Sequence, residues 1–372
     1  MAVVVVFYVS GHGLGHATRA IAIMAQLLRL GLERLVVVAP AQRDFYRRGL
    51  GDAFEFYERA CDAQLVQTSA LRVDAAASLA AYEALDRAAI LERERQFLRS
   101  HGADLVVSDV AAVPLRAAAD LGIPSAVVSN FLWLDIYAGM RTALLDGAAA
   151  DRGEPDWLAT LREDYYASRA TYLQLPGGDD QAIAQPLVAR LSRSSRRETR
   201  RDLLGVPEED SVALLTFGGH ALPSFGNATL PPRWHCVVLG VDGSALPPRF
   251  VAAPRDAYVP DLVNAADVVL GKLGYGTVSE CLAHHTPLVY VPRQLLGTNH
   301  TWPEERHLVR LLGGTGLRLD EDDFFQGRWP LERARDLRPP PGSDDGATCE
   351  DDDHLPAARV ARALLQLLPS SR

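Results

Sequence analysis

Short apolar segments that end in glycine-rich turns constrain the fold of this chain more than any other feature of its sequence. Residues 3–9 are apolar and largely β-branched, residues 10–15 form a glycine-rich turn, and residues 17–30 carry apolar side chains at helical spacing. Residues 71–100 are predicted to be helical, and strand and helix alternate again over residues 104–129. Because strands that alternate with helices form a parallel sheet covered on both faces, this pattern predicts a doubly wound α/β domain.

A second alternation of the same kind begins after the basic run at residues 193–201, which we interpret as a solvated linker helix. Its predicted strands are residues 212–217, 236–239, 268–270 and 288–291. Since 372 residues exceed one typical domain of roughly 100 to 200 residues, we predict two Rossmann-like domains that face each other across a cleft. The predicted division is a first domain at residues 1–175, a linker at 176–201, a second domain at 202–335, a mobile loop at 336–355, and a helix at 356–372 that packs back towards the first domain.

Net charge and cysteine spacing limit the partners and the compartment of the chain. Its 38 basic and 47 acidic residues give a net charge of −9, which repels polyanions such as nucleic acid and acidic membranes. The four cysteines lie far apart and indicate neither a zinc knuckle nor a disulfide framework, which fits a reducing cytoplasm. No stretch reaches the roughly 18 to 20 apolar residues of a membrane helix. We therefore expect a cytoplasmic monomer or homodimer without a nucleic-acid partner or a membrane span.

Two histidines lie in the first glycine-rich turn, whose sequence is GHGLGH at residues 11–16. An imidazole at the carboxyl edge of a sheet can accept a proton near neutral pH, which makes His12 and His16 candidate bases. Asp109 ends a strand of the same domain, so its carboxylate should reach the same edge and could fix the tautomer of an imidazole. The alternative is that both histidines cap the turn and that Asp109 caps the helix that follows it. Spacing alone does not separate these interpretations.

A second glycine-rich turn, GKLGYGTVSE at residues 271–280, leads into a predicted helix of the second domain. Its glycines and the helix N-terminus suit a phosphate, and Lys272, the one lysine of the chain, adds positive charge. Glu280 could accept hydrogen bonds from ribose hydroxyls or could close a capping box with Thr277. Gly218 and Gly219 follow a strand at the same edge and would let the backbone approach a diphosphate closely.

Several blocks of the sequence together resemble a known family. SGHGLGHATR begins at Ser10, LTFGGHALP at Leu215, GKLGYGTVSE at Gly271 and PLVYVPR at Pro287. They resemble the glycosyltransferase-like amino-terminal half of L-arabinokinase-type proteins of plants and bacteria. No galactokinase-type kinase half follows, so the resemblance does not imply sugar phosphorylation. It implies the GT-B fold, in which the second domain mainly binds a nucleotide sugar and the first mainly binds the acceptor.

The resemblance also implies roles for individual residues. His16 lies where inverting enzymes of this fold place the general base, and Asp109 lies where they place the residue that orients it. The implied donor-binding residues are Gly218, Gly219, Tyr258, Val259, Lys272, Gly274, Tyr275, Gly276, Thr277, Glu280, Glu304 and Glu305. The implied acceptor-binding residues are His12, Gly13, Asn130 and Trp133. Residues 296–303, LGTNHTWP, depart from the pattern of the family near the expected contact with the donor sugar.

The activity implied by the resemblance is that of an inverting hexosyl- or pentosyltransferase. A nucleoside-diphosphate sugar would serve as co-substrate, no cofactor is expected, and the acceptor would be a small molecule or natural product. No metal is required if Lys272 and the helix dipole carry the charge of the leaving group, and the acidic runs at residues 320–323 and 351–353 lack convergent ligands. Two alternatives remain open: a non-catalytic module that binds a nucleotide sugar or a sugar, and a nucleotide-sugar epimerase with the same fold.

Overall fold

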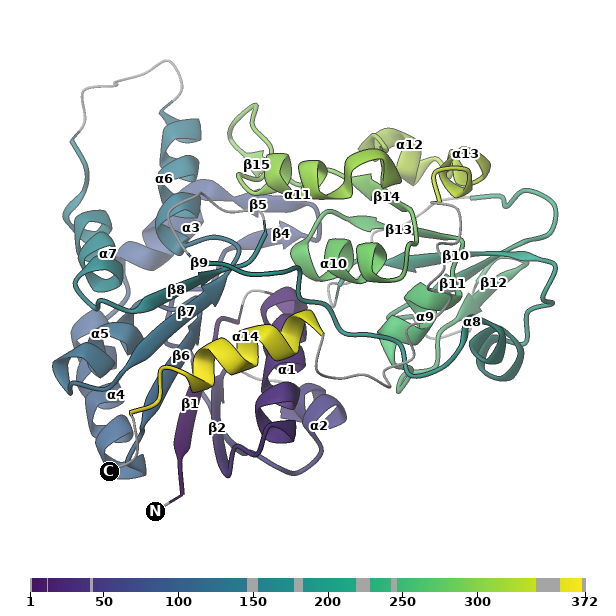
Figure 1. Ribbon diagram of the computed structural model, residues 1–372. Coiled ribbons are helices and arrows are strands. Elements are labelled where there is room, and N and C mark those ends of the chain that lie inside the picture. Colours follow the sequence, from purple (N-terminus) through teal and green to yellow (C-terminus); the bar gives the residue numbers. More distant parts are fainter. Residues whose placement is uncertain are drawn as a thin grey trace.

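Two parallel β-sheets, each flanked by helices, lie side by side in the computed structural model (Figure 1). The structure describes residues 2–11, 13–40, 43–145, 153–176, 183–218, 228–241, 246–338 and 355–369. The predicted loop at residues 336–355 falls almost entirely outside these ranges. The two sheets confirm the prediction of two doubly wound α/β domains.

The first sheet has seven parallel strands in the order β3-β2-β1-β6-β7-β8-β9. They are β1 (Val4–Val9), β2 (Arg34–Ala39), β3 (Glu55–Glu58), β6 (Leu105–Asp109), β7 (Ser125–Ser129), β8 (Thr171–Gln174) and β9 (Ile183–Ala184). Successive residues of a strand face opposite sides of a sheet. In β1, Val5 and Phe7 therefore pack into one hydrophobic core, and Val4 and Val6 pack into another. Burial on both faces explains why this strand is an unbroken apolar run.

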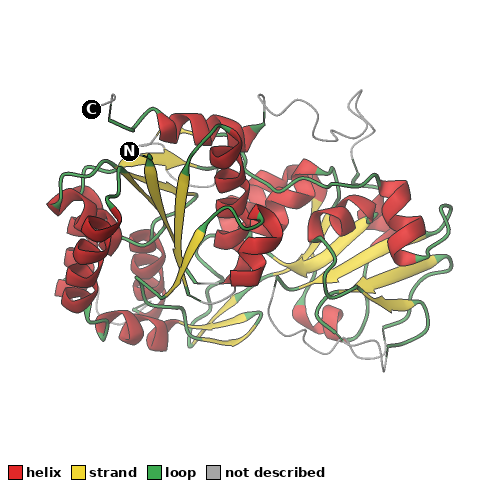
Figure 2. Ribbon diagram, turned by 90° about the horizontal axis from the view of Figure 1, so that it is seen from below, coloured by secondary structure: helices red, strands yellow, loops and turns green. Residues whose placement is uncertain are grey.

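Helices cover both faces of the first sheet (Figure 2). They are α1 (Gly13–Arg29), α2 (Arg43–Leu50), α3 (Ala75–Glu83), α4 (Arg87–His101), α5 (Val113–Asp120), α6 (Trp133–Leu144) and α7 (Asp156–Tyr166). Two expectations need correction. The turn predicted at residues 10–15 is shorter, because α1 already begins at Gly13, which has a positive φ of 67°. The stretch predicted to be helical at residues 71–100 begins instead with a strand, β5 (Arg72–Asp74).

The second sheet has six parallel strands in the order β12-β11-β10-β13-β14-β16. They are β10 (Ser211–Thr216), β11 (Trp234–Val238), β12 (Phe250–Ala252), β13 (Val268–Lys272), β14 (Leu288–Val291) and β16 (Gly316–Arg318). Its helices are α9 (Val259–Ala265), α10 (Tyr275–Ala283), α11 (Glu305–Leu312), the short η3 (Gly313–Thr315), α12 (Glu321–Phe325) and α13 (Leu331–Arg335). The two domains thus share one architecture, and the carboxyl ends of their strands are the natural place for a ligand.

The basic run between the domains is not simply a solvated helix, as the sequence predicts. It forms α8 (Arg196–Glu198) and a π-helical turn, η1 (Thr199–Leu204). Arg196 and Arg200 both bind Asp267, with 2.6 Å between Arg200 Nη2 and Asp267 Oδ2. The same Asp267 oxygen accepts the backbone N–H of Val212 at 2.7 Å. Two of the arginines therefore secure the beginning of the second domain.

A small third sheet joins the two domains. It has the order β15-β5-β4, and β15 (Gln294–Leu296) of the second domain pairs in parallel with β5 of the first, next to β4 (Gln67–Ser69). Leu71 packs into a core of the second domain, whereas Leu295 and Trp302 pack into a core of the first. The segment at residues 296–303, singled out by its unusual sequence, therefore starts in a strand that fastens the domains together.

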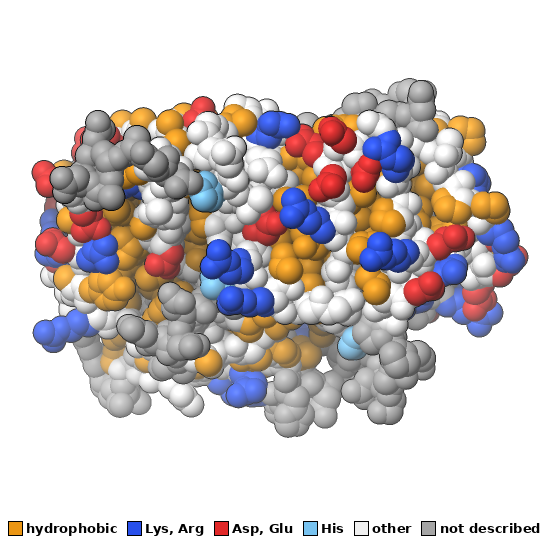
Figure 3. Space-filling view, turned by 90° about the horizontal axis from the view of Figure 1, so that it is seen from above, with side chains coloured by type: hydrophobic (Ala, Val, Ile, Leu, Met, Phe, Trp, Pro, Cys, Tyr) orange, Lys and Arg blue, Asp and Glu red, His pale blue; other side chains and the backbone are white. Residues whose placement is uncertain are grey.

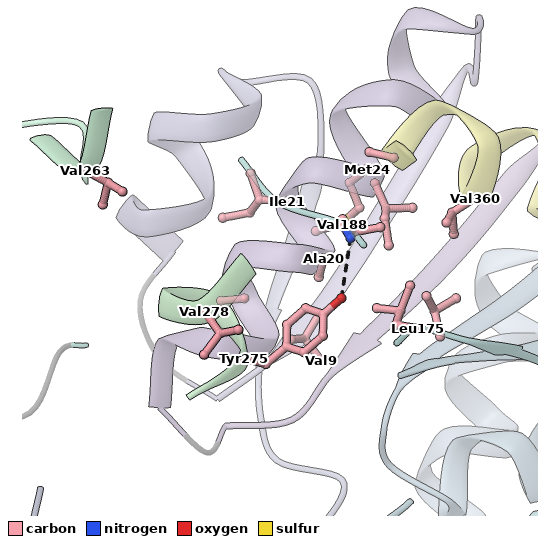
Figure 4. Close-up of a cluster of buried hydrophobic side chains, with 14 of the residues drawn as sticks. Val9, Ala20, Ile21, Met24, Leu175, Val188, Val263, Tyr275, Val278 and Val360 are labelled. Atoms are coloured by element: carbon pink, nitrogen blue, oxygen red, sulfur yellow. Dashed lines mark hydrogen bonds between the residues drawn. The ribbon is translucent and has the colours of Figure 1, made fainter. Parts of the chain in front are cut away.

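The final helix, α14 (Pro356–Leu365), lies along α1 of the first domain (Figure 1). Its apolar face, which includes Val360 and Leu364, belongs to the same core as Met24 of α1. Figure 4 shows Val360 and Met24 in this cluster together with Tyr275 of α10, whose hydroxyl accepts the backbone N–H of Val188 at 3.4 Å. A side chain of the second domain is thus built into the core of the first.

Charged side chains of both signs lie on the surface of the molecule. On the face shown in Figure 3, acidic and basic side chains are interspersed. Among the described helices, none has both the length and the apolar character needed to cross a membrane.

Candidate active site

A cleft of about 530 Å³ lies between the carboxyl edges of the two large sheets. One wall is the first part of α1, at residues 13–21, with Phe45 of α2. The opposite wall is formed by the segments that follow β10, β11, β13 and β14. Since open α/β sheets bind ligands at this edge, the cleft is the candidate active site.

His16 and Asp109 meet at the wall formed by the first domain. β1 pairs with β6 so that Val9 lies beside Asp109, and α1 starts shortly after β1. His16 Nδ1 lies 2.7 Å from Asp109 Oδ1, and both side chains are buried. The interpretation of Asp109 as a helix cap is wrong, because α5 has Ala112 at its N-cap position and no side-chain cap. His12 lies outside the described residues.

Arg19, which the sequence analysis did not single out, completes this group. Its Nε and Nη2 atoms each lie 2.5 Å from an oxygen of Asp109, and its Nη2 lies 2.8 Å from His16 Nδ1. Burial alone would raise the pKa of Asp109, but the charges of Arg19 and then His16 outweigh burial and hold this pKa below its ordinary value. The sequence could have indicated Arg19, because it lies three residues after His16 and residues three apart on a helix share a face.

The predicted acceptor-binding residues Asn130 and Trp133 lie behind the cleft rather than in it. Trp133 is only 1% exposed, and its ring centroid lies 5.9 Å from that of His16. Its indole N–H donates to Asp62 Oδ2 at 2.9 Å, and burial raises the pKa of Asp62. Asn130 accepts a hydrogen bond from Arg19 and is fully buried. Both residues therefore support the His16 group, whereas Gly13 lines the cleft itself.

The opposite wall carries the glycine-rich turn of the second domain. α10 begins at Tyr275 with Gly274 at its N-cap position, and Thr277 lies in the first turn, so the free N–H groups of the helix face the cleft. Lys272 ends β13 beside Gly218, and a Cβ built on that glycine would lie 3.7 Å from Lys272 Cε. Burial, and then the charge of Arg293, lower the pKa of Lys272 to about 7. Gly219 lies outside the described residues.

Close contact between the two walls depends on Gly276. A Cβ at this position would lie 2.9 Å from Thr18 Oγ1 and 3.4 Å from the Cα of Gly15. Arg19 lies over the ring of Tyr275, with 5.1 Å from its Cζ to the ring centroid. The beginnings of α1 and α10 therefore meet directly at the cleft.

Glu280 does not close a capping box. Because α10 begins at Tyr275, Glu280 lies in the second turn of the helix, and the capping-box interpretation is wrong. Its Oε1 instead accepts hydrogen bonds from Arg190, whose Nε lies at 2.8 Å. The Arg190 guanidinium also lies between two rings, 5.5 Å from Tyr258 and 5.4 Å from Phe45. Tyr258 and Val259, which starts α9, both line this end of the cleft.

Glu304 bridges the two domains at the other end of the cleft. It accepts a hydrogen bond from Asn130 Nδ2 of the first domain, and its Oε2 accepts the indole N–H of Trp302 at 3.2 Å. Glu305 begins α11 beside it, and its Oε2 is buried without a hydrogen-bond partner. In the described part of the chain, no group of three or more His, Cys, Asp and Glu side chains is placed to hold a metal ion.

Known proteins resemble this chain in sequence and in structure. No protein-family model matches it. It is 38% identical to L-arabinokinase of Arabidopsis thaliana over 348 residues, which cover 90% of this chain and 32% of L-arabinokinase. An uncharacterised glycosyltransferase of Methanopyrus kandleri is 27% identical over 236 residues, 60% of this chain and 66% of that protein. The solved structure of the kitacinnamycin glycosyltransferase superposes with a TM-score of 0.62 at 17% identity, covering 99% of this chain and all of that one.

The chain has the GT-B fold. The similarity to L-arabinokinase confirms the predicted resemblance, and the chain spans about a third of that relative's length. The GT-B cleft brings together most of the predicted residues: His16 with Asp109 on one wall, and the turn from Gly274 to Glu280 with Lys272 on the other. Three buried residues around the site were not predicted from the sequence: Arg19 contacts Asp109, Arg190 contacts Glu280, and Asp62 contacts Trp133.

Proposed function

We propose that this GT-B chain is a glycosyltransferase that moves a hexosyl or pentosyl unit from a nucleoside-diphosphate sugar to a hydroxyl of a small molecule, with inversion at the anomeric carbon. One observation carries the proposal. The imidazole of His16, bonded through Nδ1 to Asp109 at 2.7 Å, lies in a cleft whose opposite wall is the N-terminus of α10. In the proposal, His16 is the base and the helix N-terminus binds an anion, on the two sides of one cavity.

The two nitrogens of His16 have different tasks in this mechanism. With its Nδ1–H donated to Asp109, the imidazole keeps a lone pair on Nε2 that accepts the proton of the acceptor hydroxyl. The acceptor oxygen forms a bond to the anomeric carbon while the bond from that carbon to the phosphate oxygen breaks. The electron pair of the broken bond leaves with the nucleoside diphosphate. Attack from the side opposite the leaving group inverts the configuration.

The second domain stabilises the leaving group. The free N–H groups at the start of α10 and the ammonium of Lys272 face the developing charge of the diphosphate, so the proposal assigns this task to the protein rather than to a metal. Glu280 binds the ribose hydroxyls, and the segment at Tyr258 lies beside the nucleobase. Arg190 shares Glu280 with the ribose, since it already bonds to one carboxylate oxygen.

The proposal is tested by donor binding followed by transfer. A thermal-shift panel with UDP, dTDP, GDP and ADP identifies the base, because a ligand that binds only the folded state raises the melting temperature. The corresponding nucleotide sugars are then incubated with simple sugars and phenols as acceptors, and mass spectrometry detects the glycoside. We expect one base to be preferred and one glycoside to form. Failure of all four diphosphates to stabilise the chain would refute the donor site.

A non-catalytic module that binds a nucleotide sugar is the second candidate. It is favoured by the 2.8 Å distance between Arg19 Nη2 and His16 Nδ1. If Arg19 donates to Nδ1, the ring proton must lie on Nε2, and His16 then offers no base to the cleft. Binding of a donor that is neither hydrolysed nor transferred to any acceptor would select this candidate. A change in sugar stereochemistry without an acceptor would select an epimerase.

A further inference from the structure

We propose that Arg293, together with Lys272, forms a binding site for an oxyanion of the substrate, a phosphate or a carboxylate. The inference deepens the proposed function, and it rests on that function only for the source of the anion. The evidence for the site is the position of the two cations and the contacts of the Arg293 guanidinium.

The two cations come from neighbouring strands of the second sheet. Lys272 ends β13 and pairs in register with Val291, the last residue of β14. Arg293 follows two residues later, so both side chains leave the sheet at its carboxyl edge, and both line the cleft. The charge of Arg293 contributes to the lowered pKa of Lys272, which places the two groups within electrostatic range of each other.

Arg293 lacks the close carboxylate that the other buried arginines have. Among the described residues, Arg19, Arg190 and Arg200 are also buried, and their guanidinium nitrogens lie 2.5, 2.8 and 2.6 Å from a carboxylate oxygen respectively. For Arg293, the distance from Nη2 to Glu304 Oε2 is 3.7 Å. Its Nε atom is buried without any hydrogen-bond partner.

The surrounding residues hold the guanidinium in place without satisfying it. Arg293 lies over the ring of Trp302, with 4.3 Å from its Cζ to the ring centroid. The Glu304 carboxylate is already engaged by Asn130 and by the Trp302 indole. Burial lowers the pKa of Arg293 to about 10, although Glu304 and Glu305 act in the opposite direction. A buried donor left unsatisfied is costly, and an oxyanion in the cleft would supply the missing acceptor.

The chemistry of Arg293 selects the class of ligand. A guanidinium presents its donors as a planar fork that matches two oxygens of a phosphate or a carboxylate. Two sources offer such a group in the proposed reaction. One is the diphosphate of the donor. The other is an acidic substituent of the acceptor or of the transferred sugar, such as a sugar phosphate or a uronic acid.

Calorimetry on the full chain tests the site and separates the sources. The probes are pyrophosphate, the preferred nucleoside diphosphate, its uncharged nucleoside, glucose 1-phosphate and glucuronate. We expect Arg293→Met to weaken pyrophosphate binding about 10- to 100-fold, as for loss of a charge-assisted hydrogen bond, and to leave nucleoside binding unchanged. A parallel loss for the nucleoside diphosphate identifies the donor as the source, and a parallel loss for glucose 1-phosphate or glucuronate identifies the acidic substituent.

The matched control is Arg318→Met, which removes an exposed arginine of β16 and should change no affinity. Circular dichroism checks folding, and Arg293→Lys replaces the methionine variant if that variant does not fold, with a smaller loss expected because the fork is missing. Unchanged affinities in folded Arg293 variants, or a wild type that binds none of the anions, would overturn the site. Anion binding that depends on Arg293 without any sugar transfer would refute the proposed function and leave the site standing.

Discussion

Buried charges are compensated by close ion pairs on the first-domain wall of the cleft but not at Arg293 on the other wall. On the first-domain wall, Arg19 and Asp109 compensate each other through contacts of 2.5 Å, and His16 completes the group. On the second-domain wall, Arg293 Nη2 lies 3.7 Å from Glu304 Oε2, and burial lowers the pKa of Lys272 to about 7. The first wall is therefore electrostatically complete without a ligand, whereas the second gains most from an anion. This contrast supports the proposal that one wall serves proton transfer and the other binds negative charge.

The largest effect is expected from His16→Ala. Loss of a general base lowers turnover about 10²- to 10⁴-fold, whereas the affinity for the nucleoside diphosphate should stay unchanged because the donor site lies on the other wall. Initial rates and calorimetry measure the two quantities. His101→Ala, at the end of α4, is the control and should alter neither. A His16 variant with weakened donor binding and full turnover would show that the first-domain wall binds the donor and does not supply the base.

A large effect on stability is expected from Arg19→Met. Removing one partner of a buried ion pair typically costs about 3 to 5 kcal/mol, because Asp109 would be left buried with less compensation. Urea denaturation measures the free energy of unfolding. The control is Arg47→Met, whose partner Asp52 is exposed, and such surface pairs contribute about 0 to 1 kcal/mol. Equal losses in the two variants would show that the first wall is not held together by its ion pair.

A moderate effect is expected from pH. The pKa of Lys272 is lowered to about 7, so its ammonium is charged below that pH and neutral above it. If the ammonium is required, the affinity for the nucleoside diphosphate should fall about tenfold between pH 6 and pH 8. Calorimetry at both pH values measures the change, and Lys272→Met should remove it. A pH dependence that survives in this variant would have to arise from the ligand or from another residue.

The smallest effect on ligand affinity is expected from Glu280→Ala. The substitution should weaken binding of a ribonucleoside diphosphate by about 3- to 10-fold, as for one lost hydrogen bond, and should weaken binding of the 2′-deoxy compound less. Because Glu280 is also the carboxylate partner of the buried Arg190, its loss should lower the melting temperature as well. An unchanged affinity with a lower melting temperature would assign Glu280 to its ion pair with Arg190 alone.

Local sequence patterns predict the fold and the part of the site around His16 and Asp109. Alternating strands and helices indicate two parallel sheets, and Asp109 ends a strand next to β1, so its meeting with His16 follows from the topology. Contacts between distant segments leave no such pattern. Arg190 and Glu280 are separated by 90 residues, and β15 pairs with β5 across the domain boundary.

The sequence also does not reveal which side chains are buried. Trp133 is predicted to contact the acceptor, yet it is buried inside the first domain, where Asp62 accepts the hydrogen bond of its indole N–H. The capping motif around Thr277 was misleading for a similar reason. α10 begins at Tyr275, three residues earlier than that motif requires, and Gly276 in its first turn lies against the first domain.

The anomeric configuration of the product tests the central claim most directly. Proton NMR of a reaction with the preferred nucleotide sugar compares the coupling constant of the anomeric proton in the donor with that in the new glycosidic linkage. We predict a product of the opposite anomeric configuration, formed in equal amount to free nucleoside diphosphate, and formed about 10²- to 10⁴-fold more slowly with His16→Ala. Retained configuration would contradict direct displacement assisted by His16, and a bound donor that no acceptor consumes would make the cleft a binding site without transfer.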